Sequence, residues 1–120
     1  MFEFDDKGEV CLNDHEGTPL CLKKNTWEKV IGKEEREHLK YNTERIRECI
    51  SKPHQIRQSS KDIGTRIIYG KLERYFILPD IEVPGRELYL AVVVRGDRIV
   101  TIFPTKKLKE GKLIWPPSEK

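Results

Sequence analysis

The stretch of residues 88–103 constrains the fold more strongly than any other part of the chain. Two runs of apolar, mostly β-branched residues flank Gly96-Asp97, and glycine at the first central position of a two-residue loop is typical of a type II′ hairpin. Both faces of this hairpin are apolar, so we expect it to be central in a sheet and covered on both sides. The loop predicts the register Arg95 with Arg98, Val94 with Ile99, Val92 with Thr101 and Leu90 with Phe103.

Other segments predict further strands. Residues 9–13 and 20–23 read as a second hairpin, and residues 66–71 and 74–78 read as strands that lead toward the central hairpin. Residues 79–85 contain two prolines and a glycine, which favours a connector. The expected sheet is therefore an antiparallel meander that follows an N-terminal hairpin.

Two segments between these strands have helical spacing. Asn25 or Thr26 is a candidate N-cap for a first helix, with a glutamate in capping-box position. A charged segment follows and contains His38. A second helix opens at Asn42-Thr43, and Pro53 ends it because its ring cannot continue a helix.

The order of these elements predicts an α+β fold, in which helices pack on a twisted antiparallel sheet. A length of 120 residues suits a single domain with one modest core. We divide this domain, residues 1–120, into an N-terminal hairpin region (1–24), helices (25–52), an antiparallel sheet (54–115) and a loose tail (116–120).

The charges are distributed unevenly. Charged residues make up 36% of the chain and hydrophobic residues 37%, with a formal net charge of +3. The N-terminal end is acidic and the C-terminal end is basic, and a one-sided basic cluster is typical of nucleic-acid binding. Charge alone favours a solvated surface beside the sheet. The basic residues near the C-terminus are Arg95, Arg98, Lys106, Lys107, Lys109 and Lys112.

The sequence contains neither a signal-peptide pattern nor an apolar run long enough to span a bilayer, so we expect a cytoplasmic protein without a membrane partner. The three cysteines lack metal-ligand spacing. Cys11 and Cys21 could face each other across a hairpin. In a reducing compartment, however, we expect Cys11, Cys21 and Cys49 to be three small buried hydrophobic residues.

Most standard catalytic signatures are absent, including a phosphate-binding glycine loop, a His-Glu-x-x-His motif and a nucleophile elbow. The available groups suit acid–base catalysis and phosphate recognition better than metal chemistry. They include His38, His54, Tyr69, Lys71, Arg57, Arg66, Arg74, Tyr89 and Thr101. His54, directly after Pro53, reads as a capping or surface residue, and Thr101 alone as an ordinary strand threonine.

The order of several motifs resembles a known nuclease superfamily. They are Thr26-Trp-Glu-Lys-Val30, His38, Glu44-Arg-Ile-Arg-Glu-Cys-Ile50, residues 53–56, Tyr69, residues 89–95 and 99–105, and the closing Leu108-Lys-Glu-Gly-Lys-Leu-Ile-Trp115. This ordered set is similar to the phage-associated branch of the barnase–EndoU–colicin–RelE superfamily. The similarity covers most of the chain after Thr26. The stretch of residues 72–86 is longer than is typical of the family.

The resemblance implies an endoribonuclease-like domain, of toxin or RNA-processing type, that uses neither a metal nor a cofactor. A base removes the proton of a ribose 2′-OH, the oxygen attacks the adjacent phosphate, and an acid protonates the leaving oxygen, which leaves a 2′,3′-cyclic phosphate. His38, Tyr69 and Thr101 are the implied catalytic residues. Arg57, Lys71, Lys106, Lys107 and Lys109 are the candidate substrate-binding residues. The implied partners are RNA and an antitoxin or inhibitor protein.

Two alternative functions remain open at this point. Lys29 stands where members of this branch commonly have a histidine, which favours a non-catalytic RNA-binding module on the same fold. The acidic N-terminal end favours a protein-interaction or inhibitor domain. Toxicity on expression supports the nuclease, and salt-dependent RNA binding without cleavage supports the binding module.

Overall fold

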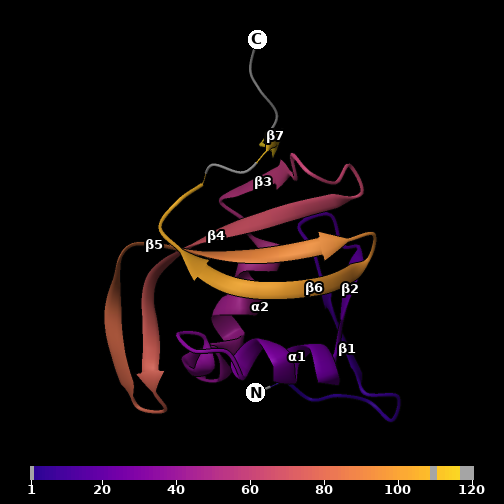
Figure 1. Ribbon diagram of the computed structural model, residues 1–120. Helices are drawn as coiled ribbons and strands as arrows, with labels where there is room; N and C mark the ends of the chain where they lie inside the picture. Colours follow the sequence, from indigo (N-terminus) through magenta and orange to yellow (C-terminus); the bar gives the residue numbers. More distant parts are fainter. Residues whose placement is uncertain (1, 109–110, 117–120) are drawn as a thin grey trace.

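The central hairpin lies in the middle of a seven-stranded sheet, as its two apolar faces predicted. The expectation that both faces are covered is only partly confirmed, because the helices cover one face and Val93, Thr101 and Phe103 on the other face are half-buried. The computed structural model describes residues 2–108 and 111–116, and within them the strands follow the order β1-β2-β6-β5-β4-β3-β7 (Figure 1). Neighbouring strands are antiparallel, except that β2 and β6 pair in parallel at one position. The strands are β1 (Glu9–Asn13), β2 (Pro19–Lys23), β3 (Gln55–Gln58), β4 (Thr65–Leu78), β5 (Ile81–Arg95), β6 (Arg98–Thr105) and β7 (Lys112–Trp115).

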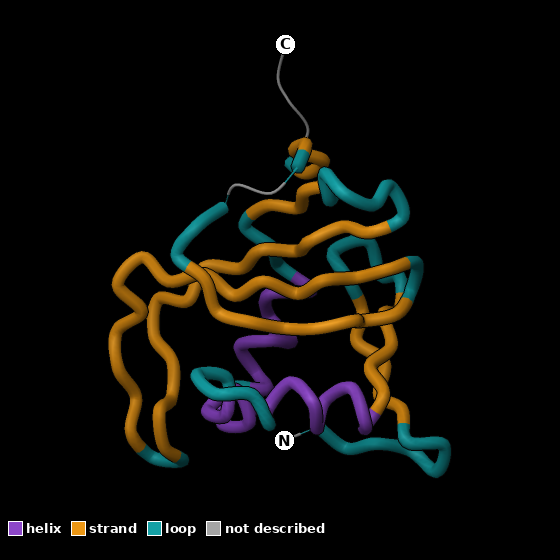
Figure 2. The backbone as a smooth tube through the Cα atoms, viewed as in Figure 1, coloured by secondary structure: helices purple, strands orange, loops and turns teal. Residues whose placement is uncertain are grey.

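The helices lie together against one face of this sheet (Figure 2). They are α1 (Lys24–Ile31), the 3₁₀ helix η1 (Glu37–Tyr41) and α2 (Thr43–Ser51). Their apolar sides and one face of β4, β5 and β6 enclose the main core. Within this main core, the side chains with no exposed surface are Leu20, Leu22, Ile46, Ile50, Ile68, Leu90, Val92, Val94, Ile99 and Ile102. The chain is therefore an α+β domain with helices on a mostly antiparallel sheet.

The start of α1 differs from the prediction. Asn25 and Thr26 both lie inside the helix, and the N-cap position is Lys23, which makes no side-chain capping bond. The predicted cap is therefore wrong, because β2 leads into α1 without an intervening loop. The second helix does begin after Asn42, and it ends before the buried Pro53.

A β-bulge changes the register in the central hairpin. The two pairs next to the turn form as predicted, but Val93 then pairs with Thr101, because Val100 is an extra, 45% exposed residue. A shift of one residue moves each later side chain to the opposite face of the strand. Ile102 therefore enters the core, while Thr101 and Phe103 point away from the helices. The predicted pairs Val92–Thr101 and Leu90–Phe103 are wrong.

Strands β4 and β5 continue beyond the rest of the sheet as a two-stranded arm (Figure 2). The predicted connector at residues 79–85 is wrong, because β5 already begins at Ile81 and pairs with the end of β4. Asn42, only 3% exposed, attaches the arm to the helices. Its amide nitrogen donates to the Phe76 carbonyl (2.7 Å) and its oxygen accepts from the Phe76 N–H (2.7 Å), as a neighbouring strand would.

The cysteines only partly follow the prediction. Cys11 and Cys21 are direct partners in the β1–β2 pair and form a disulfide, and the Cys11 side chain is exposed. The expectation that these two residues are buried hydrophobic residues is therefore wrong, while the alternative that they face each other across a hairpin is confirmed. Cys49 is a free, buried thiol in α2, as predicted.

Candidate functional site

The face of the sheet that points away from the helices gathers side chains from strands that are distant in sequence. We call this surface the outer face. Its members alternate with the core residues along four neighbouring strands. They are Gln55 and Arg57 from β3, Ile67, Tyr69 and Lys71 from β4, Tyr89, Ala91 and Val93 from β5, and Thr101, Phe103 and Thr105 from β6.

The register arranges these side chains in rows across the strands. One row runs Arg57, Ile67, Val93, Thr101, and the next runs Gln55, Tyr69, Ala91, Phe103. A third row runs Lys71, Tyr89, Thr105. Four residues predicted from the sequence as site residues therefore share one surface: Arg57, Tyr69, Lys71 and Thr101.

A small second core lies at the centre of the outer face. Ile67, Tyr69 and Ala91 are buried there, and Phe103 and Leu108 pack against them. Tyr69 is only 2% exposed, so its ring is buried beneath the exposed side chains of the outer face. This burial suits a core residue better than the freely accessible catalytic acid that the family resemblance implies.

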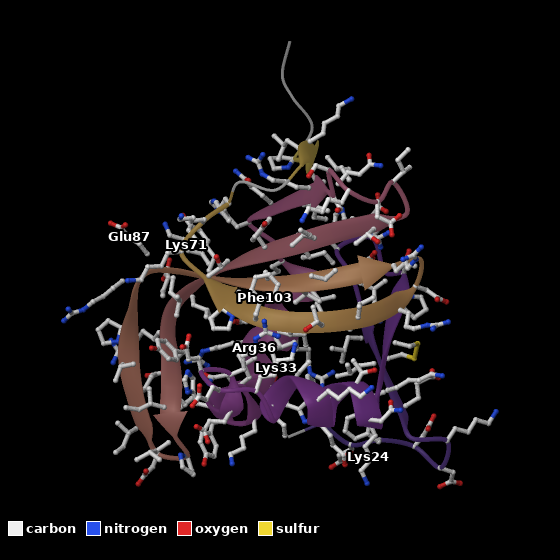
Figure 3. All side chains as sticks on the ribbon, viewed as in Figure 1. Lys24, Lys33, Arg36, Lys71, Glu87 and Phe103 are labelled. Atoms are coloured by element: carbon white, nitrogen blue, oxygen red, sulfur yellow. A yellow bond between two sulfur atoms is a disulfide. The ribbon has the colours of Figure 1, made fainter. Side chains whose placement is uncertain are left out.

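Arg36 reaches the outer face from the turn between α1 and η1. Its Nη1 donates to the Thr101 hydroxyl oxygen (3.2 Å), and its guanidinium carbon lies 5.1 Å from the centre of the Phe103 ring. Figure 3 shows Arg36 beside β6, close to Phe103. The hydrogen bond and the cation–π contact fix the guanidinium over the Phe103 ring and beside Thr101. The sequence analysis did not identify Arg36, because nothing local marks a charged turn residue as a neighbour of a strand 65 positions later.

Arg57 provides a second fixed cation. Its Nε donates to the Gln55 side-chain oxygen (2.9 Å), and its Nη1 donates to the Gly111 carbonyl (3.2 Å). These two bonds hold the planar guanidinium at the β3 side of the outer face. The remaining N–H groups of a guanidinium suit a phosphate oxygen.

His54 and Tyr89 lie together near the Lys71 end of the outer face. Their ring centres are 5.5 Å apart and the rings are tilted by 32°. The His54 N–H donates to the Tyr69 carbonyl (2.7 Å), which ties this residue to β4, and its side chain is exposed. Lys71 pairs with Tyr89 across the strands and is also exposed. The sequence analysis named His54 and Tyr89 as available groups but did not select them.

His38 occupies a different place from the other predicted site residues. It belongs to η1, its ring lies 5.9 Å from that of Tyr75, and its carbonyl accepts a hydrogen bond from Asn42. It lines a small cavity whose other walls include Leu39 and Leu90, both buried in the main core. His38 therefore lies on the helical side of the sheet, away from Thr101 and Lys71.

The predicted basic residues that follow β6 lie beside the outer face. Lys106 and Lys107 are exposed, and the next residue, Leu108, packs against the outer-face cluster. The Lys107 N–H donates to the Thr105 hydroxyl oxygen (3.2 Å), which shapes this turn. Lys109 lies outside the described residues.

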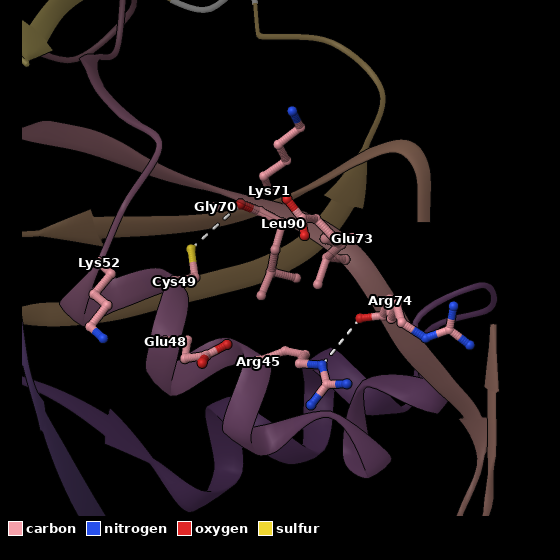
Figure 4. Close-up of a pocket in the computed structure, with 10 residues that line it drawn as sticks. Arg45, Glu48, Cys49, Lys52, Gly70, Lys71, Glu73, Arg74 and Leu90 are labelled. Carbon is pink, nitrogen blue, oxygen red and sulfur yellow. Dashed lines mark hydrogen bonds between the residues drawn. The ribbon is translucent and has the colours of Figure 1, made fainter. Parts of the chain in front are cut away.

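A cavity of about 520 Å³ lies between α2 and β4 (Figure 4). The Cys49 thiol at its wall is within hydrogen-bond distance of the Ile68 carbonyl (3.7 Å) and the Leu90 carbonyl (3.6 Å). Burial raises the pKa of the Cys49 thiol, so it remains protonated and a poor nucleophile. Lys71 lines the same cavity, but in Figure 4 its side chain points away from Cys49. The chemistry of the outer face therefore does not extend into this cavity.

Within the described ranges, one group of residues has atoms close enough to share a metal ion: Glu9, Cys11 and Cys21. Both of its thiols are joined in the disulfide, which removes the thiolates that a soft metal needs. The group also lies on β1 and β2, at the far end of the strand order from Arg57.

Comparison with protein-family models, curated proteins and solved structures finds no match to this chain. Among the described residues, no helix combines the length and the apolar character needed to cross a bilayer.

Proposed function

We propose that this domain is an endoribonuclease-like protein, of toxin or RNA-processing type, whose RNA substrate lies across the outer face. One observation carries the proposal. Cations, aromatic rings and hydroxyl groups from β3, β4, β5, β6 and the α1–η1 turn converge on one surface. Fixed guanidinium groups suit the phosphates of a nucleic acid, and half-exposed aromatic rings suit unpaired bases.

The proposed chemistry uses side chains as acid and base. None of the eleven residues that define the outer face is a carboxylate, the ligand type that a catalytic Mg²⁺ prefers. A histidine, two fixed arginines and a lysine do lie on or beside this face. These groups suit removal of the 2′-OH proton and stabilisation of the phosphorane charge.

We assign the roles by position. His54 is the proposed general base or acid, because it is the exposed imidazole nearest to the outer face. Lys71, which pairs with Tyr89 across the strands, neutralises the charge of the reacting phosphate, while Arg57 and the Arg36–Thr101 pair bind flanking phosphates of the RNA. Tyr69 has a packing role, as a buried residue beneath this surface.

A non-catalytic RNA-binding module is the second candidate. Two placements favour it: His38 lies on the helical side of the sheet, and Tyr69 is almost fully buried. Both residues would have to reach substrate if the nuclease resemblance held at every position. In this alternative the same cations and rings bind RNA without cutting it.

End-group analysis of cleaved RNA tests the nuclease. We expect cleavage that continues in EDTA, leaves a 2′,3′-cyclic phosphate, and fails on DNA and on RNA with a 2′-methoxy group at the cut, since the nucleophile is the 2′-OH. Cleavage that requires Mg²⁺ and leaves a plain 3′-hydroxyl would exclude this mechanism. Binding of RNA without any cleavage would establish the second candidate.

The turn after β6 provides a separate test of where RNA binds. Replacing Lys106 and Lys107 together with glutamine should weaken RNA binding and reduce the slope of log affinity against log salt by about 1.4, or about 0.7 for each lost phosphate contact. Replacing Lys24 and Lys29 of α1, which are exposed on the helical side, makes the same change in net charge. If the two double variants weaken RNA binding equally, the net charge of the protein accounts for the effect, and RNA does not follow a defined path along the outer face.

A further inference from the structure

A second cleft lies where the two ends of the sheet approach each other. The turn between β1 and β2 reaches across to β4 and β7, on the side of the sheet opposite to the outer face. Asp14 Oδ2 lies 3.9 Å from Arg66 Nη2, and the ring centres of His15 and Trp115 are 5.0 Å apart. These contacts frame a cavity of about 610 Å³ that the β5–β6 turn also borders through Asp97. This volume suits a small planar ligand.

Aromatic side chains form one part of the cleft wall. Trp115 and His15 are both half-buried, and Ile114 and Ile56 extend the apolar surface beside them. The His15 Nδ1 atom is buried without a hydrogen-bond partner among the described residues. Buried polar atoms in folded proteins usually have a hydrogen-bond partner. The wall therefore combines a stacking surface with an unsatisfied polar group.

The polar groups of the cleft include a carboxylate and a guanidinium that lie next to each other. The Asp14 Oδ1 accepts hydrogen bonds from the N–H groups of Glu16 (2.9 Å) and Thr18 (2.8 Å), which fixes the carboxylate. Its Oδ2 is too far from Arg66 for a hydrogen bond, so the guanidinium keeps its donors for another partner. Glu16 and Asp97 are also among the residues that line the cleft. A ligand here can therefore meet an acceptor, Asp14 Oδ2, next to the donors of Arg66.

We propose that this cleft binds a guanine base. Guanine presents two adjacent acceptors, O6 and N7, that suit the planar fork of Arg66. Its N1–H and exocyclic amine are adjacent donors that suit a carboxylate such as that of Asp14 or Glu16. Its flat ring suits the surface formed by Trp115 and His15. Adenine and the pyrimidines lack this combination of adjacent acceptors and adjacent donors.

The charge of the cleft indicates that the base enters it and the phosphate does not. Three acidic residues, Asp14, Glu16 and Asp97, and one arginine, Arg66, line the cleft. A phosphate inside this wall would meet repulsion from like charges. Guanosine should therefore bind at least as well as guanosine monophosphate. This inference stands independently of the proposed nuclease function, because the cleft shares no residue with the outer face.

Calorimetric titration with guanosine tests the inference directly. We expect saturable binding of guanosine to the intact chain, with adenosine, cytidine and uridine at least about tenfold weaker. Arg66→Gln should weaken guanosine binding at least about fivefold, since it removes a bidentate contact to the base. Arg47→Gln in α2, which lies outside both the cleft and the outer face, is the matched control and should leave guanosine binding unchanged. No heat of binding at millimolar guanosine would overturn the proposal.

Tryptophan fluorescence locates the bound base. The chain has two tryptophans, and Trp27 is buried in the main core at 7% exposure. In the variant Trp27→Phe the signal comes from Trp115, which guanosine should quench with the affinity measured by calorimetry. Binding without quenching, or with full strength in Arg66→Gln, would place the base elsewhere and overturn the assignment.

Short RNAs separate the two sources of the base. A free nucleoside site should ignore RNA, whereas a site for a guanine within RNA should bind a guanine-containing tetranucleotide more tightly than guanosine. A tetranucleotide without guanine should not quench Trp115 in either case. Strong quenching by this guanine-free control would contradict base recognition in the cleft. Cleavage of RNA is measured separately, so failure of the nuclease proposal leaves this result interpretable.

Discussion

The substitution Val92→Asp is expected to prevent folding, or to lower the free energy of unfolding by at least about 4 kcal/mol. Val92 has no exposed surface and lies between the helices and the centre of the sheet. A carboxylate there would be buried without a partner, which is one of the most costly single changes in a protein core. Urea denaturation followed by circular dichroism measures the loss.

The neighbouring residue provides the matched control. Val93 is half-buried and belongs to the outer face, where the carboxylate of Val93→Asp can reach water. We expect Val93→Asp to be destabilised by clearly less than Val92→Asp, by about 1 to 2 kcal/mol. Equal losses would show that the outer face is as deeply covered as the main core. A stable, cooperatively melting Val92→Asp protein would contradict the central position of the hairpin.

The sequence predicts the strands of the hairpin better than it predicts their register. Gly96 has a positive φ of 66°, and the pairs beside it form as a tight turn requires. A strand with apolar residues on both faces does not distinguish one register from the next, since either register buries hydrophobic side chains. The hydrophobic pattern of the strands therefore could not predict the bulge at Val100, although this bulge decides which face of the sheet Thr101 occupies.

The arm formed by β4 and β5 escaped prediction for a related reason. Prolines and glycine in residues 79–85 favour a connector, yet Pro84 pairs with Arg74 and Gly85 lies beside the Leu72 carbonyl. A β-carbon at Gly85 would come within 1.5 Å of that carbonyl oxygen, so glycine is required by close packing at the bulge. Glycine in a sequence can therefore indicate either a loop or, as at Gly85, a position where two backbone segments lie in close contact.

The candidate site was predictable in part. Strand alternation alone assigns Tyr69 and Lys71 to one face of β4, and the structure brings Arg57 and Thr101 to the same surface. The placement of Arg36 depends on how the α1–η1 turn meets β6, which is a tertiary contact without a local signal. His54 lies between Pro53 and the first residue of β3. Only the pairing of β3 with β4 shows which surface it borders.

The two histidines give the decisive comparison for catalysis. His54→Ala is expected to lower the rate of RNA cleavage by about two to four orders of magnitude, the usual contribution of a general acid or base. His38→Ala should leave the rate nearly unchanged, because its ring lies against Tyr75 on the helical side of the sheet. Cleavage of a labelled RNA under single-turnover conditions measures both rates, with circular dichroism as the check that each variant folds.

The outcomes of this pair separate the assignments. His54 is exposed, so its replacement should change the free energy of unfolding by no more than about 0.5 kcal/mol. A large loss of rate in His54→Ala with unchanged stability is therefore a chemical effect. A loss in His38→Ala alone would return the catalytic role to the residue that the family resemblance implies and would require the substrate to reach η1. Unchanged cleavage by both variants would exclude imidazole catalysis by either residue and leave Lys71 and Arg57 as the groups to replace next.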